Sequence, residues 1–200
     1  MPAGVRPAFK ALWDLDLAFA DVVATSTDPN LGAIRLAWWR ERLEELDLGK
    51  AAPAERRLQA VASDLLLGGI TVGELSKLED AWLPLLQSLP WGAEQVDGLK
   101  VRGRILFGIG GRLLGASPSD AETAGELWSL VDGAEHCSDS DTRNMLLREA
   151  AALAPSRAPT MVRPLTMLAA LSAHDIRPRG SFRRGLTALR HRYRGTFPRG

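Results

Sequence analysis

The chain has 200 residues, of which 46% are hydrophobic and 24% charged, and its formal net charge is +1 at pH 7. This composition excludes a disordered or fibrous protein and predicts a globular one with a sizeable core. The single cysteine, Cys137, excludes an internal disulfide and favours the cytoplasm, and no apolar run is long enough for a signal peptide or a transmembrane helix.

Helical periodicity begins close to the N-terminus. Apolar residues from Ala8 to Val22 recur at the spacing of one helix face and predict a first helix. The TSTDPN stretch that follows predicts a break, in which Asp28 caps a second helix and Pro29 occupies its first position. The second helix should end near Leu48. Because the link is short, we expect these two helices to pack antiparallel, with at least one tryptophan of the second helix mostly buried.

The rest of the chain also reads as helices, without sustained strand alternation. Further helices are predicted at about 54–67, from Thr71 onward with a kink at Pro84, and at about 94–114, 119–134, 141–154, 161–173 and 180–194. The sequence TVGE at 71–74 has the pattern of a capping box, in which a threonine and a glutamate satisfy each other's backbone. With no repeat and no evident linker, these elements predict an all-α protein, a single-domain helical bundle over residues 1–200.

Residues 31–46, LGAIRLAWWRERLEEL, place two apolar ridges on the second helix, with two arginines between them. The ridges are Leu36, Trp39, Leu43 and Leu46 on one side and Leu31, Ile34 and Trp38 on the other, and the arginines are Arg35 and Arg42. Arginine is costly to bury unless an anion pairs with it. A cation pair between apolar walls therefore favours an amphipathic ligand with an anionic head. The alternative is that both arginines extend over core side chains and keep their charged ends in water.

Several common chemistries lack their motifs. The glycine cluster GRILFGIGGRLLG follows no strand and matches no complete phosphate-binding pattern, so its small residues are interpreted as places where helices approach closely. The three histidines are scattered, without HExxH or a second cysteine, which gives a zinc site little support. The GxSxG elbow of many hydrolases is absent.

The C-terminal segment is strongly basic. From Ile176 to Gly200 there are eight arginines and no acidic residue, and the remaining 175 residues carry a net charge of −7. In the helix predicted at about 180–194, one stripe contains Phe182, Leu186, Leu189 and Tyr193. A nucleic-acid-binding arm would not need this stripe, because phosphate contacts are electrostatic. The helix is expected either to pack on its own acidic domain or to make peripheral contact with an anionic membrane.

The stretches ALWDLDLAFADVV, IRLAWWRERLEEL, RGRILFGIGGRLLG and AGELWSLVDGA resemble the squalene/phytoene synthase family, particularly its short bacterial members. These head-to-head prenyltransferases are all-α proteins with the isoprenoid synthase fold. The resemblance implies a prenyl diphosphate or another amphipathic lipid as ligand and an apolar cavity between two helices. It further implies Mg²⁺ held by an Asp-rich motif on each of these helices, and arginines that bind the diphosphate, for which Arg35 and Arg42 are the candidates.

The sequence departs from the family at the metal motifs. The three aspartate positions of the first motif fall on Ala20, Asp21 and Ala24, so one carboxylate remains. The second motif matches SLVDGAEHCSDSD, whose acids are arranged differently. The remaining metal candidates are Asp14, Asp21, Asp132 and Asp139. Asp14 and Asp21 share a helix face but lie about 10 Å apart along its axis, too far for one ion to bridge.

Two functions from different classes follow from the resemblance. In the first, the degraded motifs have ended metal-dependent catalysis, and the protein acts as a prenyl- or lipid-binding or assembly-type factor. In the second, it remains an active Mg²⁺-dependent transferase that condenses prenyl diphosphates in squalene or carotenoid biosynthesis. A third interpretation is a helical interaction module in which the double-tryptophan helix only forms core. We expect a cytoplasmic protein, with the basic helix as a means of peripheral contact at the inner membrane face.

Overall fold

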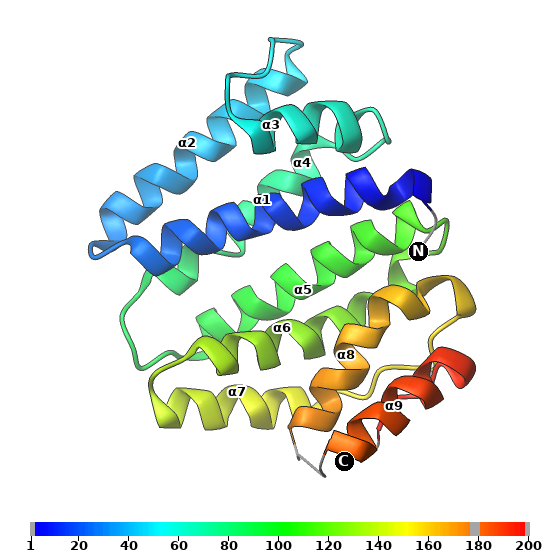
Figure 1. Cartoon of the computed structure of the whole chain (residues 1–200). Helices are drawn as coiled ribbons and strands as arrows, with labels where there is room; N and C mark the ends of the chain where they lie inside the picture. The colour runs from blue at the N-terminus through cyan, green and yellow to red at the C-terminus, as the bar shows by residue number, and fades with distance from the viewer. Residues whose placement is uncertain (1–2, 177–180, 199–200) are drawn as a thin grey trace. The chain divides into compact units, whose positions relative to one another are not determined.

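The computed structural model describes residues 3–176 and 181–198. All regular structure in this part is helical, without a strand, which confirms the all-α prediction (Figure 1). The contacts divide the chain into two compact units, unit 1 (Met1–Ser88) and unit 2 (Leu89–Gly200), each described here by itself. The single domain stays a prediction. No helix in the described ranges is both long and apolar enough to cross a membrane.

The helix bounds follow the sequence predictions closely. Unit 1 contains α1 (Arg6–Thr25), α2 (Pro29–Asp47), α3 (Arg56–Ala60) continued by a π-helical turn (Val61–Leu66), and α4 (Val72–Asp80). Unit 2 contains α5 (Ala93–Leu113), α6 (Glu122–His136), α7 (Ser140–Ala152), α8 (Arg163–Asp175) and α9 (Ser181–Arg194). The predicted kink at Pro84 is wrong, because α4 ends at Asp80 and Pro84 lies in a separate 3-10 turn, Leu83–Leu86.

The two helix caps predicted for unit 1 are both present. The Asp28 carboxylate accepts the Asn30 backbone N–H at 2.7 Å, and Pro29 occupies the first turn of α2, where a missing N–H costs nothing. At α4, Thr71 Oγ1 accepts the Glu74 N–H at 3.3 Å, and the Glu74 carboxylate accepts the Thr71 N–H at 3.0 Å. These side chains satisfy donors that the helix itself leaves unpaired.

In unit 1, α1 contacts α2, α3 and α4, and the chain reverses direction between α1 and α2 (Figure 1). Trp39 of α2 is 8% exposed and meets Phe19 of α1 edge to face, with 6.0 Å between ring centroids, which confirms the predicted burial of a tryptophan. The next residue of α2, Arg40, pairs with Glu79 and Asp80 at the end of α4. Burial raises the pKa of the Glu79 carboxyl despite this pairing.

In unit 2, α5 and α6 pack with their backbones in contact. A Cβ atom on Gly103 would lie 2.1 Å from the Gly125 carbonyl oxygen, and one on Gly125 would lie 2.1 Å from the Gly103 carbonyl oxygen. Only glycine allows this approach at both positions. The interpretation of the glycine-rich stretch as a close helix contact is therefore confirmed at Gly103.

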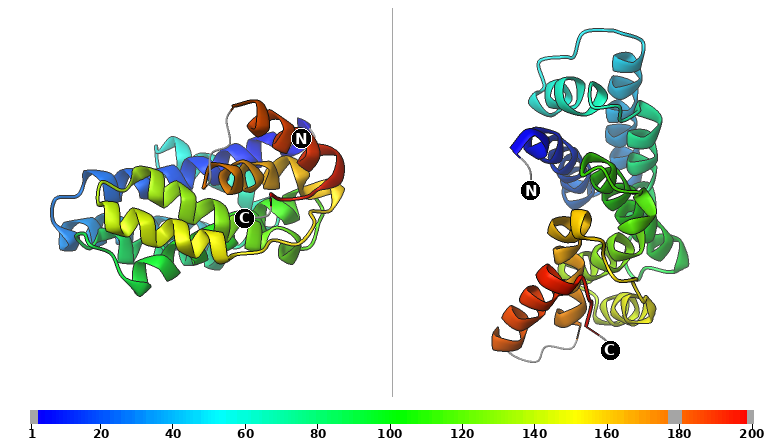
Figure 2. Two further views of the ribbon diagram at one scale, coloured as in Figure 1. Left: turned by 90° about the horizontal axis from the view of Figure 1, so that it is seen from below. Right: turned by 90° about the vertical axis from the view of Figure 1, so that its right-hand side faces the viewer.

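The other helices of unit 2 build outward from α6. The helix α7 runs beside α6, α8 crosses α6, and α9 packs on α8 at one edge of the unit (Figures 1 and 2). Between α7 and α8 the chain is mostly irregular, apart from a 3-10 turn at Thr160–Val162. This irregular connection and the segment after α9 lie side by side, because the Ala158 N–H donates to the Gly195 carbonyl oxygen at 2.8 Å.

Candidate functional site

The candidate diphosphate-binding arginines both lie on α2 in unit 1. Arg35 Nη1 donates to the hydroxyls of Thr25 and Ser26, at 3.0 and 3.2 Å, and so ties α2 to the end of α1. Arg42 Nη1 lies 2.9 Å from the Glu45 carboxylate, and its guanidinium lies 6.0 Å from the Trp38 ring centroid. Each arginine therefore already has partners within its own unit.

The two ridges of α2 have different environments. Leu36, Trp39 and Leu43 are buried, whereas Leu31, Ile34 and Trp38 are exposed. The exposed ridge lies next to Arg42, whose Nε is buried and has no hydrogen-bond partner in the described structure. The pattern predicted from the sequence is present, but only one ridge serves the core of unit 1.

The metal candidates of unit 1 are engaged by cations. Asp14 pairs with Lys10, one turn earlier on α1. Asp21 lies 3.1 Å from Arg57 Nη2 of α3 and is largely exposed. A magnesium ion would have to displace both cations, and the two carboxylates lie two turns apart on the same helix. They do not offer a set of converging oxygen ligands.

The metal candidates of unit 2 have structural partners too. Asp132 of α6 lies 2.7 Å from Nη1 of Arg102 of α5, a residue that is 4% exposed. Asp139 caps α7, and hydrogen bonding by the Thr142 side chain and backbone N–H lowers the pKa of its carboxyl. Across residues 3–176 and 181–198, no group of three or more His, Cys, Asp or Glu side chains could hold a metal ion. The described carboxylates therefore do not fit a magnesium site of the family's kind, and Mg²⁺ stays a prediction.

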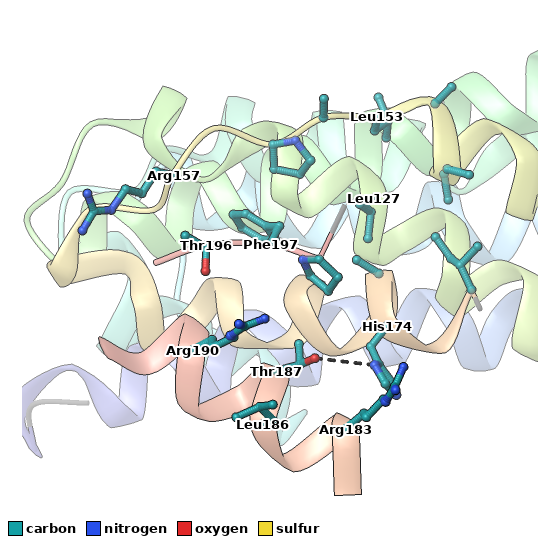
Figure 3. A pocket seen from close by; sticks show the side chains of 18 residues that line it. Leu127, Leu153, Arg157, His174, Arg183, Leu186, Thr187, Arg190, Thr196 and Phe197 are labelled. Atoms are coloured by element: carbon teal, nitrogen blue, oxygen red, sulfur yellow. Dashed lines mark hydrogen bonds between the residues drawn. The ribbon is translucent and has the colours of Figure 1, made fainter. Parts of the chain in front are cut away.

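A pocket of about 990 Å³ lies in unit 2, in a region that the sequence did not single out (Figure 3). Its walls come from α6, the end of α7, the chain after α7, α8, α9 and the segment after α9. The wall formed by α6, the end of α7 and the chain after α7 is mostly apolar, although Arg157 also lies on it. The larger apolar residues of the whole pocket are Leu127, Leu153, Ile176, Leu186 and Phe197, of which Leu186 lies on α9. The volume lies in the range of small-molecule sites, and polar groups form a substantial part of the lining.

The polar side of the pocket is basic. Arg183 and Arg190 lie along α9, on the side of the pocket opposite Leu153 (Figure 3). No carboxylate in the described residues pairs with either of them. Between them Thr187 Oγ1 lies 3.5 Å from Nδ1 of His174, a buried residue of α8. The pocket thus combines a mostly apolar wall with the guanidiniums of Arg183 and Arg190 and the Thr187 hydroxyl on the side of α9.

Buried hydrogen bonds hold α9 and the segment after it in place. His191 of α9 is fully buried, with Nε2 2.9 Å from Thr166 Oγ1 of α8 and Nδ1 donating to the Thr196 carbonyl oxygen at 3.1 Å. Burial lowers the pKa of this histidine. Arg157 Nε donates to the Arg194 carbonyl oxygen at 2.5 Å and joins the chain after α7 to the end of α9. The pocket walls are therefore tied to one another.

Sequence reasoning missed this pocket for a physical reason. Its lining comes from segments far apart in the chain, and residues 153–159 have no helical periodicity to place them. The available signal is the run of arginines after Ile176, which predicts either packing on the acidic domain or contact with an anionic membrane but not the lining of a pocket. The cavity expected between the helix of Asp21 and the helix at about 119–134 would involve both units and stays a prediction.

Comparison with protein-family models, curated proteins and solved structures found no match for this chain. The resemblance to the squalene/phytoene synthase family thus rests on the sequence stretches that carry it.

Proposed function

We propose that this protein binds a prenyl diphosphate or a similar amphipathic lipid anion in the unit 2 pocket. In this proposal it is a squalene/phytoene synthase-like protein with an isoprenoid synthase-type helical bundle, and it works as a cytoplasmic prenyl- or lipid-binding or assembly-type factor without metal-dependent catalysis. The observation that carries the proposal is the pairing of an apolar wall with Arg183 and Arg190, neither of which has an acidic partner in the described residues.

The chemistry of the pocket matches the two ends of such a ligand. Arginine binds phosphate oxygens through two parallel N–H donors, and these charge-assisted bonds are stronger than neutral ones. The apolar wall can take a hydrocarbon chain, at about 0.8 kcal/mol for each methylene removed from water. Because the guanidiniums supply the positive charge, binding of the anion requires no metal ion.

The loss of catalysis is proposed from the partners of the four acidic candidates. A prenyltransferase needs converging carboxylates that hold Mg²⁺ against the leaving diphosphate. Here Asp14, Asp21 and Asp132 pair with cations, and Asp139 caps a helix. Measuring pyrophosphate release from farnesyl diphosphate with Mg²⁺ decides between the two functions. Steady release by the wild-type chain would establish the transferase and end the proposal of a non-catalytic protein.

The binding proposal is tested by calorimetric titration of the full chain with farnesyl diphosphate in EDTA. We expect saturable binding by the wild type. Without its two guanidiniums, Arg183→Gln/Arg190→Gln should lose about 1.4 kcal/mol of binding free energy, which corresponds to about tenfold weaker binding. Farnesol and inorganic pyrophosphate, each lacking one end of the ligand, should bind more weakly. Arg192→Gln is the matched control, since Arg192 lies on α9 but does not line the pocket. Equal affinity of the double variant and the wild type would contradict the proposal.

A further inference from the structure

The helix α9 presents its apolar stripe outward. Phe182 is 86% exposed, and the other stripe residues, Leu186, Leu189 and Tyr193, are exposed as well. The opposite face of the helix carries His191, which is fully buried against α8. The helix thus packs on its own unit, which was one of the two arrangements expected for it, but it does so through the face of His191 and not through the stripe.

This orientation is fixed at both ends of α9. Near its start, Arg184 forms a two-pronged ion pair with Asp175 at the end of α8, in which Nε lies 3.1 Å from Oδ1 and Nη2 lies 3.0 Å from Oδ2. Near its end, Arg163 Nη1 donates to the Tyr193 carbonyl oxygen at 3.0 Å. With buried His191 between them, these contacts hold the helix so that its apolar stripe stays on the surface of unit 2.

Positive charge flanks the stripe on both sides. At helical spacing, Arg183, Arg190 and Arg194 follow one side of the stripe and Arg192 the other. None of these four pairs with a carboxylate in the described residues, and Ser181–Arg194 contains no acid. A narrow apolar stripe between cationic flanks is typical of helices that lie in the plane of a membrane interface.

We infer that α9 docks unit 2 on an anionic bilayer surface, with Phe182, Leu189 and Tyr193 entering the acyl boundary and the flanking arginines contacting lipid phosphates. The charge complementarity of these arginines selects the anionic surface. The apolar stripe favours a bilayer over a nucleic acid as the partner, because the phosphates of a nucleic acid provide no apolar surface for the stripe to contact. Since Arg183, Leu186 and Arg190 also line the pocket, docking through α9 places the pocket beside the lipid headgroups.

The test is co-sedimentation of the full chain with vesicles of phosphatidylcholine alone and of phosphatidylcholine mixed with phosphatidylglycerol. We expect the protein to bind the mixed vesicles. Added salt should weaken this binding, because salt screens exposed charges. Phe182→Gln/Leu189→Gln should bind these vesicles at least about tenfold more weakly, since two apolar side chains no longer enter the bilayer. Leu48→Gln/Leu67→Gln is the matched control, because these leucines of unit 1 are 77% and 85% exposed.

A second variant, Arg192→Gln/Arg194→Gln, tests how much the flanking arginines contribute to membrane binding and leaves the apolar stripe intact. It should bind the mixed vesicles more weakly at low salt and resemble the wild type at high salt. None of the substituted residues lines the pocket, so all variants should keep the wild-type affinity for farnesyl diphosphate in solution, which separates this inference from the proposed function. Circular dichroism checks that each variant is folded.

The inference would be overturned by no binding of the wild type to mixed vesicles, by equal binding to neutral vesicles, or by undiminished binding of Phe182→Gln/Leu189→Gln. Wild-type self-association that this variant abolishes, without vesicle binding, would assign the stripe to a protein contact and also overturn it.

Discussion

Replacing Gly103 with valine is expected to lower the free energy of unfolding of unit 2 by about 3 kcal/mol or more. Even the first added carbon would lie 2.1 Å from the Gly125 carbonyl oxygen and 2.8 Å from the Ser129 Cβ. The first of these atoms belongs to the backbone of α6, which cannot rotate away as a side chain can. The two helices would have to separate, and the apolar contacts along both would weaken. Urea denaturation followed by circular dichroism measures the loss.

A matched glycine in the same helix provides the control. A Cβ on Gly108 would come no closer than 3.4 Å to another atom, the end of the flexible Glu122 side chain. Gly108→Ala should therefore keep or raise the stability, because alanine is favoured over glycine in helices by about 0.5–1 kcal/mol. If Gly103→Val proved as stable as Gly108→Ala, the close backbone contact between α5 and α6 would be refuted.

The second large effect is expected at Asp132, one of the metal candidates. Asp132→Ala should lower the free energy of unfolding by about 2 kcal/mol, because it removes the carboxylate that faces the buried Arg102 guanidinium. We expect less than the full cost of breaking a buried pair, since Asp132 is partly exposed and Arg102 also lies over the Trp128 ring at 4.8 Å. Asp132→Asn keeps a hydrogen-bond acceptor for Arg102 and should lower the free energy of unfolding by less.

Asp21→Ala is the control for this prediction. Asp21 pairs with Arg57 at the surface of unit 1, and exposed pairs contribute at most about 0.5–1 kcal/mol. Thermal unfolding with and without Mg²⁺ then tests whether either carboxylate binds the metal. A Mg²⁺-dependent rise in the wild-type Tm that Asp132→Ala abolishes would make Asp132 a metal ligand rather than only the partner of Arg102.

The helices could be predicted because their signals are local. Caps at Asp28 and Thr71 and the apolar spacing of α1 depend on residues only a few positions apart, and they lie where expected. The glycine cluster of α5 also predicts a close contact with another helix, since clustered small residues suggest helices that approach closely. Which helix Gly103 meets could not be predicted, because spacing along one helix does not identify its partner.

The candidate site was harder to predict because its parts are brought together only by tertiary packing. The cations that engage Asp21 and Asp132 come from α3 and α5, far from either residue in the chain. Only the pair between Asp14 and Lys10 follows from a four-residue spacing. The periodicity of α9 located its apolar stripe correctly but favoured the core-facing orientation that such stripes usually have. Burial of His191 on the opposite face decides the orientation instead.

Photoaffinity labelling locates the ligand most directly. The full chain is irradiated with a farnesyl diphosphate analogue that carries a photoreactive tail, in EDTA, and the labelled peptides are identified by mass spectrometry. We expect labels within 150–157 and 183–198, which line the pocket, and their loss when unlabelled farnesyl diphosphate competes. Competed labels confined to α1 and to the α2 segment of Arg35 and Arg42 would contradict the pocket in unit 2 and place the ligand on unit 1.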